Sequence, residues 1–176
     1  MIGWHFTKGL FLRDGRRLPA VGETLRHDGP LVPCESGLHF SERAIDALQY
    51  APGAMCHRVE GSGEMLPHGG DKWCARERTI LWSIDATEVL HTSGRAEALR
   101  VSHLREAPPV VLEYLRTGNP AIRAAAFAAA WASARAAAFA AAWDAAWDAA
   151  RDAAWSAQNE RLEAMLIAAH EKETAP

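Results

Sequence analysis

The sequence predicts an α+β protein, in which a small, mostly antiparallel sheet domain with short helices precedes a long helical region rich in alanine and tryptophan. Residues 1–107 hold most of the glycine, proline and histidine and all the β-prone runs. Residues 121–172 contain no glycine or proline, and alanine is the best helix former. Breakers gather between these two parts. We therefore expect an α+β domain at 1–107, a linker with a short helix at 108–120, and an alanine-rich helical repeat region at 121–176, as one helix or a hairpin.

The charge, the cysteines and the first residues of the chain limit the partners and the compartment that we expect. The formal net charge of −3 gives no global attraction to nucleic acid or to an anionic membrane, so neither is an expected partner. The three cysteines are scattered and form no CxxC pair, which favours a reducing compartment. The first residues do not read as a signal peptide, and charged residues interrupt the alanine run, so we expect a cytoplasmic protein without a membrane span.

Five runs in the first domain predict strands. Residues 3–7 read as a short strand, and Leu25 within 18–28 alternates with polar neighbours as on a half-buried edge strand. Residues 38–40 form a short apolar run. Further strands are expected over 55–66 and 73–84, the first interrupted by a bulge at Gly61-Ser62-Gly63.

Capping residues predict where the helices begin. Ser41 is a good N-cap for a helix over 42–50. Asp85-Ala86-Thr87-Glu88 matches a capping box followed by one helical turn, and Ser93 is expected to cap a separate helix over 94–106. Two more helices are expected, over 110–115 and after Asn119-Pro120.

The alanine-rich run from Arg123 to about Gln158 repeats in steps of four residues, each opened by a bulky side chain. An α-helix turns about 100° per residue, so each bulky side chain lies about 40° further round than the last. The aromatic residues therefore cannot all face one neighbour, and the run must fold back, be wrapped, or be shared between chains. Trp is enriched at binding hot spots. The expected partner-binding residues are Phe127, Trp131, Phe139, Trp143, Trp147 and Trp155.

Local patterns support little chemistry. No two of the eight histidines have an HxH or HxxxH spacing, and we expect no metal site. A nucleophilic pair of Cys34 with His39 or His57 stays open beside buried structural cysteines. The sequence has neither a phosphate-binding glycine loop nor a clustered basic stripe.

One motif carries a family resemblance. Cys34-Glu35-Ser36-Gly37-Leu38-His39 fits Cys-x-x-Gly-(Leu/Phe)-His, and a short helix ending at Tyr50 follows it. Val59-Glu60-Gly61 and Asp71-Lys72 fit the later part of the pattern. Residues 3–90 thus resemble a domain of unknown function that recurs in phage and prophage genomes. The resemblance brings no activity. It implies an accessory protein in the cytoplasm of a bacterial host. The aromatic residues of the alanine-rich run, which cannot all face one neighbour, predict that this protein binds a host or phage protein or itself as a homodimer.

The order of parts is also similar to ADP-ribosyltransferases of the histidine–tyrosine–glutamate class. His5 and Thr7 match the family's His-Gly-(Ser/Thr) motif, although Phe6 replaces the glycine. The Gly-Leu-x-Phe strand is present, although His39 replaces its tyrosine, and Tyr50 follows eleven residues later as the family spacing asks.

That similarity implies four catalytic residues. His5 would hold the nicotinamide ribose of NAD, His39 and Tyr50 would flank the nicotinamide ring, and Glu77 would be the catalytic glutamate. The leading hypothesis remains a non-enzymatic protein without a cofactor, which works by protein–protein interaction and inhibits a host defence system. The alternative is an ADP-ribosyltransferase-like enzyme that uses NAD, so whether the chain is an enzyme is left open.

Overall fold

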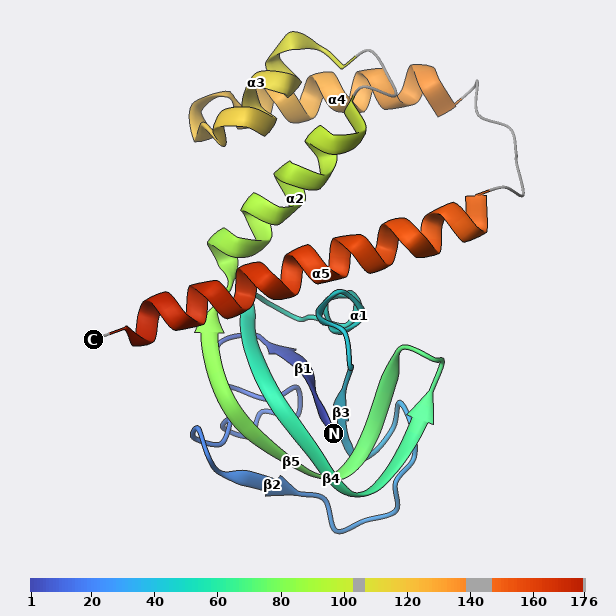
Figure 1. The fold of residues 1–176 in the computed structure, drawn as a ribbon, viewed down its shortest axis with the longest axis vertical. Coiled ribbons are helices and arrows are strands. Elements are labelled where there is room, and N and C mark those ends of the chain that lie inside the picture. Colours follow the sequence, from blue (N-terminus) through green and yellow to red (C-terminus); the bar gives the residue numbers. More distant parts are fainter. Residues whose placement is uncertain (103–106, 139–146, 176) are drawn as a thin grey trace. The chain divides into compact units, whose positions relative to one another are not determined.

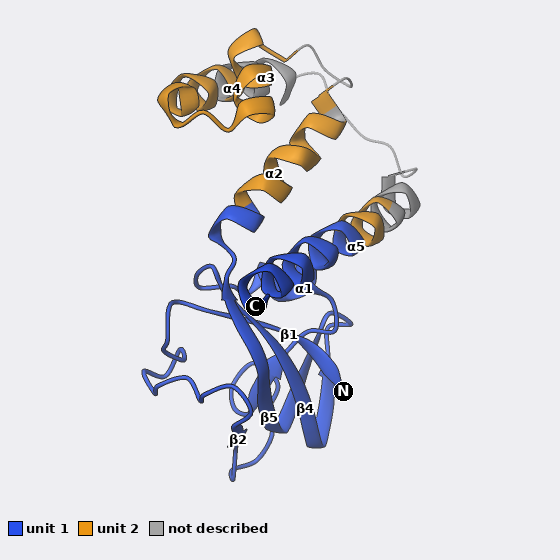
Figure 2. Cartoon of the chain, turned by 60° about the vertical axis from the view of Figure 1, so that its left-hand side comes forward, with its two compact units in different colours: residues 1–90, 159–176 blue, residues 91–158 orange. Residues whose placement is uncertain are grey.

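The structure is a computed structural model that describes residues 1–102, 107–138 and 147–175 (Figure 1). An antiparallel sheet and several helices confirm the α+β fold class. The described contacts group the chain into two compact units, residues 1–90 with 159–176, and residues 91–158 (Figure 2). The three-part division drawn from composition stays a prediction, but the end of the chain packs with the first ninety residues.

The sheet of the first unit is antiparallel throughout. Its strands are β1 (Ile2–Thr7), β2 (Thr24–Arg26), β3 (Leu38–Phe40), β4 (Met55–His68) and β5 (Lys72–Asp85), as the strand-forming runs predict. The order is β1-β4-β5-β2, and β3 also pairs with β5. Two backbone hydrogen bonds, of 2.7 and 3.0 Å, join Trp4 of β1 to Ser41 at the end of β3. The sheet therefore curves until its first strand meets the end of β3.

Bulges bend the long hairpin of β4 and β5. The pairing register shifts between Arg58 and Val59, and again between Ser62 and Met65, which confirms the bulge expected around Gly61-Ser62-Gly63. A bulge increases local twist and bends the strand, which lets two long strands wrap a small core. Gly61 also makes room for an aromatic ring, because a Cβ at this position would lie 2.3 Å from the Phe40 ring.

Helix α1 (Ala44–Gln49) begins later than the sequence predicts. Ser41 is buried and exchanges backbone hydrogen bonds with Trp4, so it does not cap the helix and that prediction is wrong. The N-cap residue is Arg43, whose side chain makes no capping hydrogen bond. Ser41, which the local sequence predicts as the N-cap of the helix, thus closes the sheet instead.

The end of the chain supplies the missing cap. Helix α5 (Trp147–Thr174) places Asn159 and Glu163 beside the first turn of α1. The Ile45 amide donates to Asn159 Oδ1 at 3.0 Å, and the Ala44 amide donates to Glu163 Oε1 at 2.9 Å. Unsatisfied amides at a helix start are normally capped by a nearby residue of the same segment. Here residues more than a hundred positions away do it, which ties α5 into the first unit.

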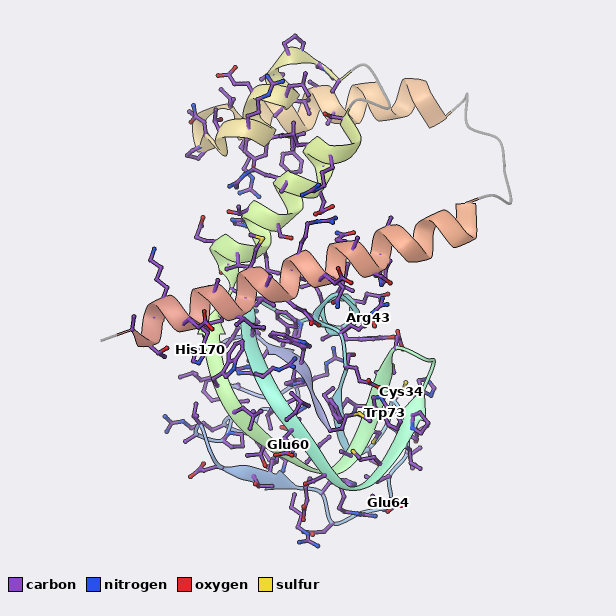
Figure 3. The ribbon with its side chains drawn as sticks, in the orientation of Figure 1. Cys34, Arg43, Glu60, Glu64, Trp73 and His170 are labelled. Carbon is purple, nitrogen blue, oxygen red and sulfur yellow. The ribbon has the colours of Figure 1, made fainter. Side chains whose placement is uncertain are left out.

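Apolar and aromatic contacts hold the same part of α5. Leu162 and Leu166 are buried. His170, labelled on α5 in Figure 3, stacks on Trp82 of β5 with ring centroids 4.4 Å apart and planes within 8°. Trp82 in turn meets Trp4 edge to face at 5.6 Å. Residues 159–170 therefore belong to the core of the first unit, although the sequence pattern extends the alanine-rich region through them.

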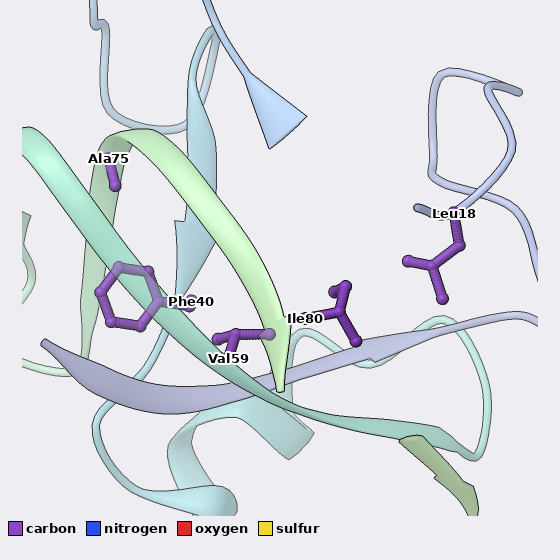
Figure 4. Packing of buried hydrophobic residues seen from close by; sticks show 5 residues of the cluster. All are labelled: Leu18, Phe40, Val59, Ala75 and Ile80. Atoms are coloured by element: carbon purple, nitrogen blue, oxygen red, sulfur yellow. The ribbon is translucent and has the colours of Figure 1, made fainter. Parts of the chain in front are cut away.

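A compact apolar cluster fills the curved sheet (Figure 4). Its members are Leu18, Phe40, Val59, Ala75 and Ile80, with Leu12, Met65 and Trp73 packed against them. Full burial of one such large side chain stabilises the fold by about 1.5–3 kcal/mol. The cluster joins β3, β4 and β5 to the loop that carries Leu18, so it sets the position of that loop.

Helix α2 (Thr87–Val101) crosses from the first unit into the second. Asp85 Oδ1 accepts a hydrogen bond from the Thr87 amide at 2.9 Å, as its predicted capping role requires. The helix then runs through Ser93 without a break, so the predicted new start at Ser93 is wrong. A serine and a glycine inside a helix cost only about 1 kcal/mol, which is too little to stop one that is already growing.

Three short elements follow in the second unit. Helix α3 (Pro109–Thr117) ends at Gly118, which adopts the left-handed conformation at φ 65°. A single 3-10 turn, η2 (Pro120–Ile122), is capped by Asn119, and α4 (Arg123–Ala138) continues from it. The alanine-rich run thus supplies α4 and the beginning of α5. No described helix is long and apolar enough to cross a membrane.

Candidate functional site

A cleft of about 600 Å³ opens in the first unit. Residues from β1 and β3, the loops 11–16 and 34–37, and the end of α1 form its walls. The charged and titratable side chains that line it are His5, Arg13, Asp14, Arg16, His27, Cys34, Glu35, His39, Tyr50, Lys72 and Arg78. Four of these carry a fixed positive charge and two are carboxylic acids, so the cleft is cationic although the whole chain is not.

Arg78 of β5 is the most unusual of these groups. Its residue is only 3 % exposed, and its Nη1 donates to the His39 carbonyl at 2.5 Å. Its Nε is buried without a hydrogen-bond partner, and it makes no ion pair with the described residues. Burial lowers the pKa of Arg78 to about 10, so the guanidinium keeps its charge at neutral pH. The cleft therefore contains a buried positive charge that no described carboxylate balances by direct contact.

Hydrogen bonds to Thr7 and Ser83 fix the ring of His57, next to the cleft-lining residue Thr7. The hydroxyl of Thr7 donates to the Gly9 carbonyl at 2.6 Å, so its oxygen accepts from His57 Nε2, 2.8 Å away. His57 Nδ1 must then accept from Ser83 Oγ at 2.7 Å. The imidazole is fully buried, and burial followed by the charge of Arg78 lowers its pKa to about 4. His57 is thus neutral and structural.

Two histidines that line the cleft, His5 and His39, are also held in the neutral form. His5 lies 6.1 Å from the His57 ring, and burial followed by the Arg78 charge lowers the pKa of His5 well below its usual value. His39 Nε2 accepts from the Cys34 amide at 3.0 Å, and burial followed by the Lys72 and Arg78 charges lowers the pKa of His39. The positive potential of the cleft therefore comes from arginine and lysine.

The rim of the cleft is built around Tyr50. Its hydroxyl donates to Asp71 Oδ2 at 2.6 Å, while Lys72 Nζ lies over its ring, 4.1 Å from the centroid. Arg13 reaches the Tyr50 carbonyl from the facing loop at 3.5 Å. The ring of Phe11 on that loop is 58 % exposed. The rim thus combines exposed aromatic rings with the charged ends of Arg13 and Lys72.

Three of the four residues predicted as catalytic come together in this cleft. His5, His39 and Tyr50 line it, and Glu77 does not. Glu77 Oε1 pairs with Arg26 at 3.1 Å, and its other oxygen accepts from Ser62 Oγ at 3.1 Å. Its neighbour Arg78 faces the cleft instead.

Sequence reasoning missed Arg78. In a strand, every second side chain points to the same face. Counting back two residues from the apolar Ile80 puts Arg78 on the inner face, and this single charge at a buried position was the available signal.

The predicted partner-binding residues are placed only in part. Phe127 of α4 is 60 % exposed, with its ring 6.2 Å from that of Tyr114 on α3. Trp155 is half-buried. Phe139 and Trp143 lie outside the described residues, and for Trp131 and Trp147 only the helix backbone is described. Within the described chain, no cluster of three histidine, cysteine or acidic side chains could hold a metal ion.

Comparison with known proteins finds one family whose match covers most of the residues that line the cleft. Residues 7–92 match the DUF7666 family, described as a domain of unknown function. The match includes His39, Tyr50 and Arg78, and leaves out His5 and the part of α5 that completes the first unit. No curated protein and no solved structure matches the chain.

Proposed function

We propose that the DUF7666 domain of this protein binds a small anionic ligand in the cleft, with Arg78 as the anchoring donor. One observation carries the proposal: a charged guanidinium, 3 % exposed, lines the cleft with its Nε unpaired and without an ion pair to any described carboxylate. Removing a charge from water costs several kcal/mol unless an opposite charge or a full set of hydrogen bonds compensates it.

A purely structural role accounts for Arg78 incompletely. The bond to the His39 carbonyl links β3 to β5, and it uses one of the five N–H groups of the guanidinium. A neutral side chain that donates one hydrogen bond would join the two strands at a smaller desolvation cost. A carboxylate or phosphate ligand supplies both the missing acceptors and the missing charge.

The shape and surroundings of the cleft fit a small molecule. Its volume of about 600 Å³ lies within the range of small-molecule sites. Arg13, Arg16 and Lys72 add positive charge around the opening, and Phe11 and Tyr50 add exposed aromatic surface. A ligand with a phosphoryl or carboxyl group and a flat ring would use all of these features.

Calorimetric titration tests the function. Orthophosphate, pyrophosphate and a dicarboxylate are titrated into the full chain at constant ionic strength. Wild type is expected to bind at least one of them, Arg78→Lys to lose tenfold or more in affinity, and Arg78→Met to show no binding. The matched control is Arg26→Gln, because Arg26 pairs with Glu77 outside the cleft. Equal binding by wild type and Arg78→Met sinks the proposal.

The convergence of His5, His39 and Tyr50 favours NAD-dependent ADP-ribosyl transfer as one form of this function, while the placement of Glu77 weighs against it. Incubation with labelled NAD and bacterial lysate separates the two forms. Transfer requires label on a protein and its loss in Glu77→Gln. NAD binding without label supports a binding module.

A second candidate function is protein–protein interaction through the second unit, as part of a phage accessory role against a host defence. The exposed Phe127 beside Tyr114 favours it, because large exposed rings mark interaction sites. The long helical region, as a hairpin or as one helix, would supply the rest of the surface. Solution mass and partner capture, compared between wild type and Phe127→Ala, test it, and unchanged results for both count against it.

A further inference from the structure

We propose that Cys34 is a modification site, at which an anionic low-molecular-weight disulfide exchanges with the thiol and leaves a mixed disulfide in the cleft. The inference rests on the proposed function, because the same cationic cleft would attract the disulfide. It adds a covalent partner class and a nucleophile to that cleft.

Accessibility selects this cysteine. Cys34 is exposed and lines the cleft, whereas Cys56 and Cys74 are buried. Burial raises the pKa of both buried thiols, to well above the usual range for Cys56, and this keeps them protonated and unreactive. Reaction with a disulfide in water is therefore expected at Cys34 (Figure 3).

The neighbours of the thiol favour attack on a disulfide. Lys72 lines the same cleft as Cys34, and its ammonium lies over the Tyr50 ring, 4.1 Å from the centroid. The positive charges of Lys72 and Arg78 attract an anionic disulfide into the cleft that contains the Cys34 thiol. Arg78 is the independent sign of an anion in the same cleft, since it is buried, charged and unpaired at Nε.

The exchange is balanced without a further reagent. The Cys34 thiol loses its proton to solvent, and the thiolate attacks one sulfur of R–S–S–R. The bond from Cys34 to that sulfur forms as the original S–S bond breaks, and the departing R–S⁻ takes up a proton. Cys34 is oxidised and one half of the small disulfide is reduced. The R group then occupies the cleft, where it would compete with other anions.

Two disulfide probes of different charge test the site. The full chain is reacted with the dianion dithiobis-nitrobenzoate and with neutral dithiodipyridine, and the ratio of the two rate constants is compared with that of mercaptoethanol. A cationic cleft is expected to raise the ratio roughly tenfold or more. About 1 M NaCl, where the Debye length is about 3 Å, should remove the increase. A ratio equal to that of mercaptoethanol overturns the proposal.

Variants assign the effect to residues. Cys34→Ser should abolish the adduct in intact-mass analysis, Lys72→Gln should lower the rate ratio, and Arg26→Gln should leave it unchanged. An adduct that persists in Cys34→Ser overturns the proposal, because the protein then reacts elsewhere.

Orthophosphate titration of Cys34→Ser tests the proposed anion binding separately from the modification of Cys34. Phosphate binding together with an unselective wild-type thiol overturns the modification site and leaves the anion cleft standing. An unselective thiol in a protein that binds none of orthophosphate, pyrophosphate and the dicarboxylate overturns both. A selective thiol with phosphate binding supports both.

Discussion

Two arginines of the first unit, the half-buried Arg58 and the buried Arg78, lie in different surroundings, and the contrast supports the proposed binding face. Arg58 of β4 lies over the Trp4 ring, 4.2 Å from its centroid, and the charge of Glu163 on α5 supports it. Among the described residues, Arg78 of β5 has neither an aromatic ring against its guanidinium nor an ion pair, and the carboxylate whose charge supports it is Asp14 of a cleft loop. Each of the two arginines also has one buried N–H group without a described partner, Nη1 of Arg58 and Nε of Arg78. Burial lowers the pKa of both guanidinium groups. The chain covers the first with its own last helix and leaves the second facing a cleft.

Because of this difference, we expect substitutions on the two faces of the sheet to change different properties of the protein. The face beneath α5 is closed by stacked rings, buried leucines and helix caps, so changes there should act on folding. The cleft face carries the charge of Arg78, for which we propose an anionic ligand, so changes there should act on binding and on the response to anions and pH.

The covered face should give the largest effect. Leu166 of α5 is fully buried, so Leu166→Ala is expected to lower the free energy of unfolding by about 3 kcal/mol through lost burial and a cavity. Its neighbour Ile167 is 41 % exposed, and Ile167→Ala should change stability by less than about 1 kcal/mol. Urea unfolding of both variants measures these changes. Equal losses of unfolding free energy would show that α5 is not part of the core.

Acid should destabilise the protein through the face that carries His57. Its folded pKa of about 4 lies below the unfolded value of 6.5, so the unfolded chain binds more protons between these values. Stability is therefore complete above pH 6.5 and falls by up to about 3 kcal/mol as pH drops to 4. The free energy of unfolding should depend less steeply on pH for His57→Gln across this range. His68→Gln, exposed at the end of β4, should keep the wild-type slope.

Phosphate should stabilise the cleft face alone. A ligand that binds only the folded state adds up to about 2.7 kcal/mol at a hundredfold excess over its Kd. Thermal unfolding with phosphate, at matched ionic strength, should show a higher Tm for wild type and for Arg58→Lys. Arg78→Met should show no increase. If Arg58→Lys also fails to respond, the distinction between the two arginines breaks down.

The smallest effect should come from the distant helix cap. Asn159→Ala removes the acceptor of the Ile45 amide, and loss of a cap costs about 1 kcal/mol. Glu160, exposed on the same turn of α5, is the control, and Glu160→Ala should be neutral within about 0.5 kcal/mol. Identical midpoints in urea would mean that the cap contributes nothing to the packing of α5.

Local patterns predicted most of the elements and part of the site. Apolar alternation and turn residues place β1 to β5 and the bulge in β4, because strands and bulges depend on near neighbours in sequence. His5, His39 and Tyr50 were singled out by their order along the chain, and all three line the cleft. Arg78 was missed because an arginine is typical of the outer face of a strand, and only the alternation back from Ile80 marks it as an inner residue.

The sequence by itself determined the fold class, the strands and the helical character of the alanine run, since these follow from propensity and short-range periodicity. Only the tertiary structure decided that Ser41 closes the sheet instead of capping α1, and that residues 159–170 return to cap it. It also decided that Arg78 is buried and Glu77 is not part of the cleft. Such features depend on which segments meet in space, and contacts across a hundred residues leave no local pattern.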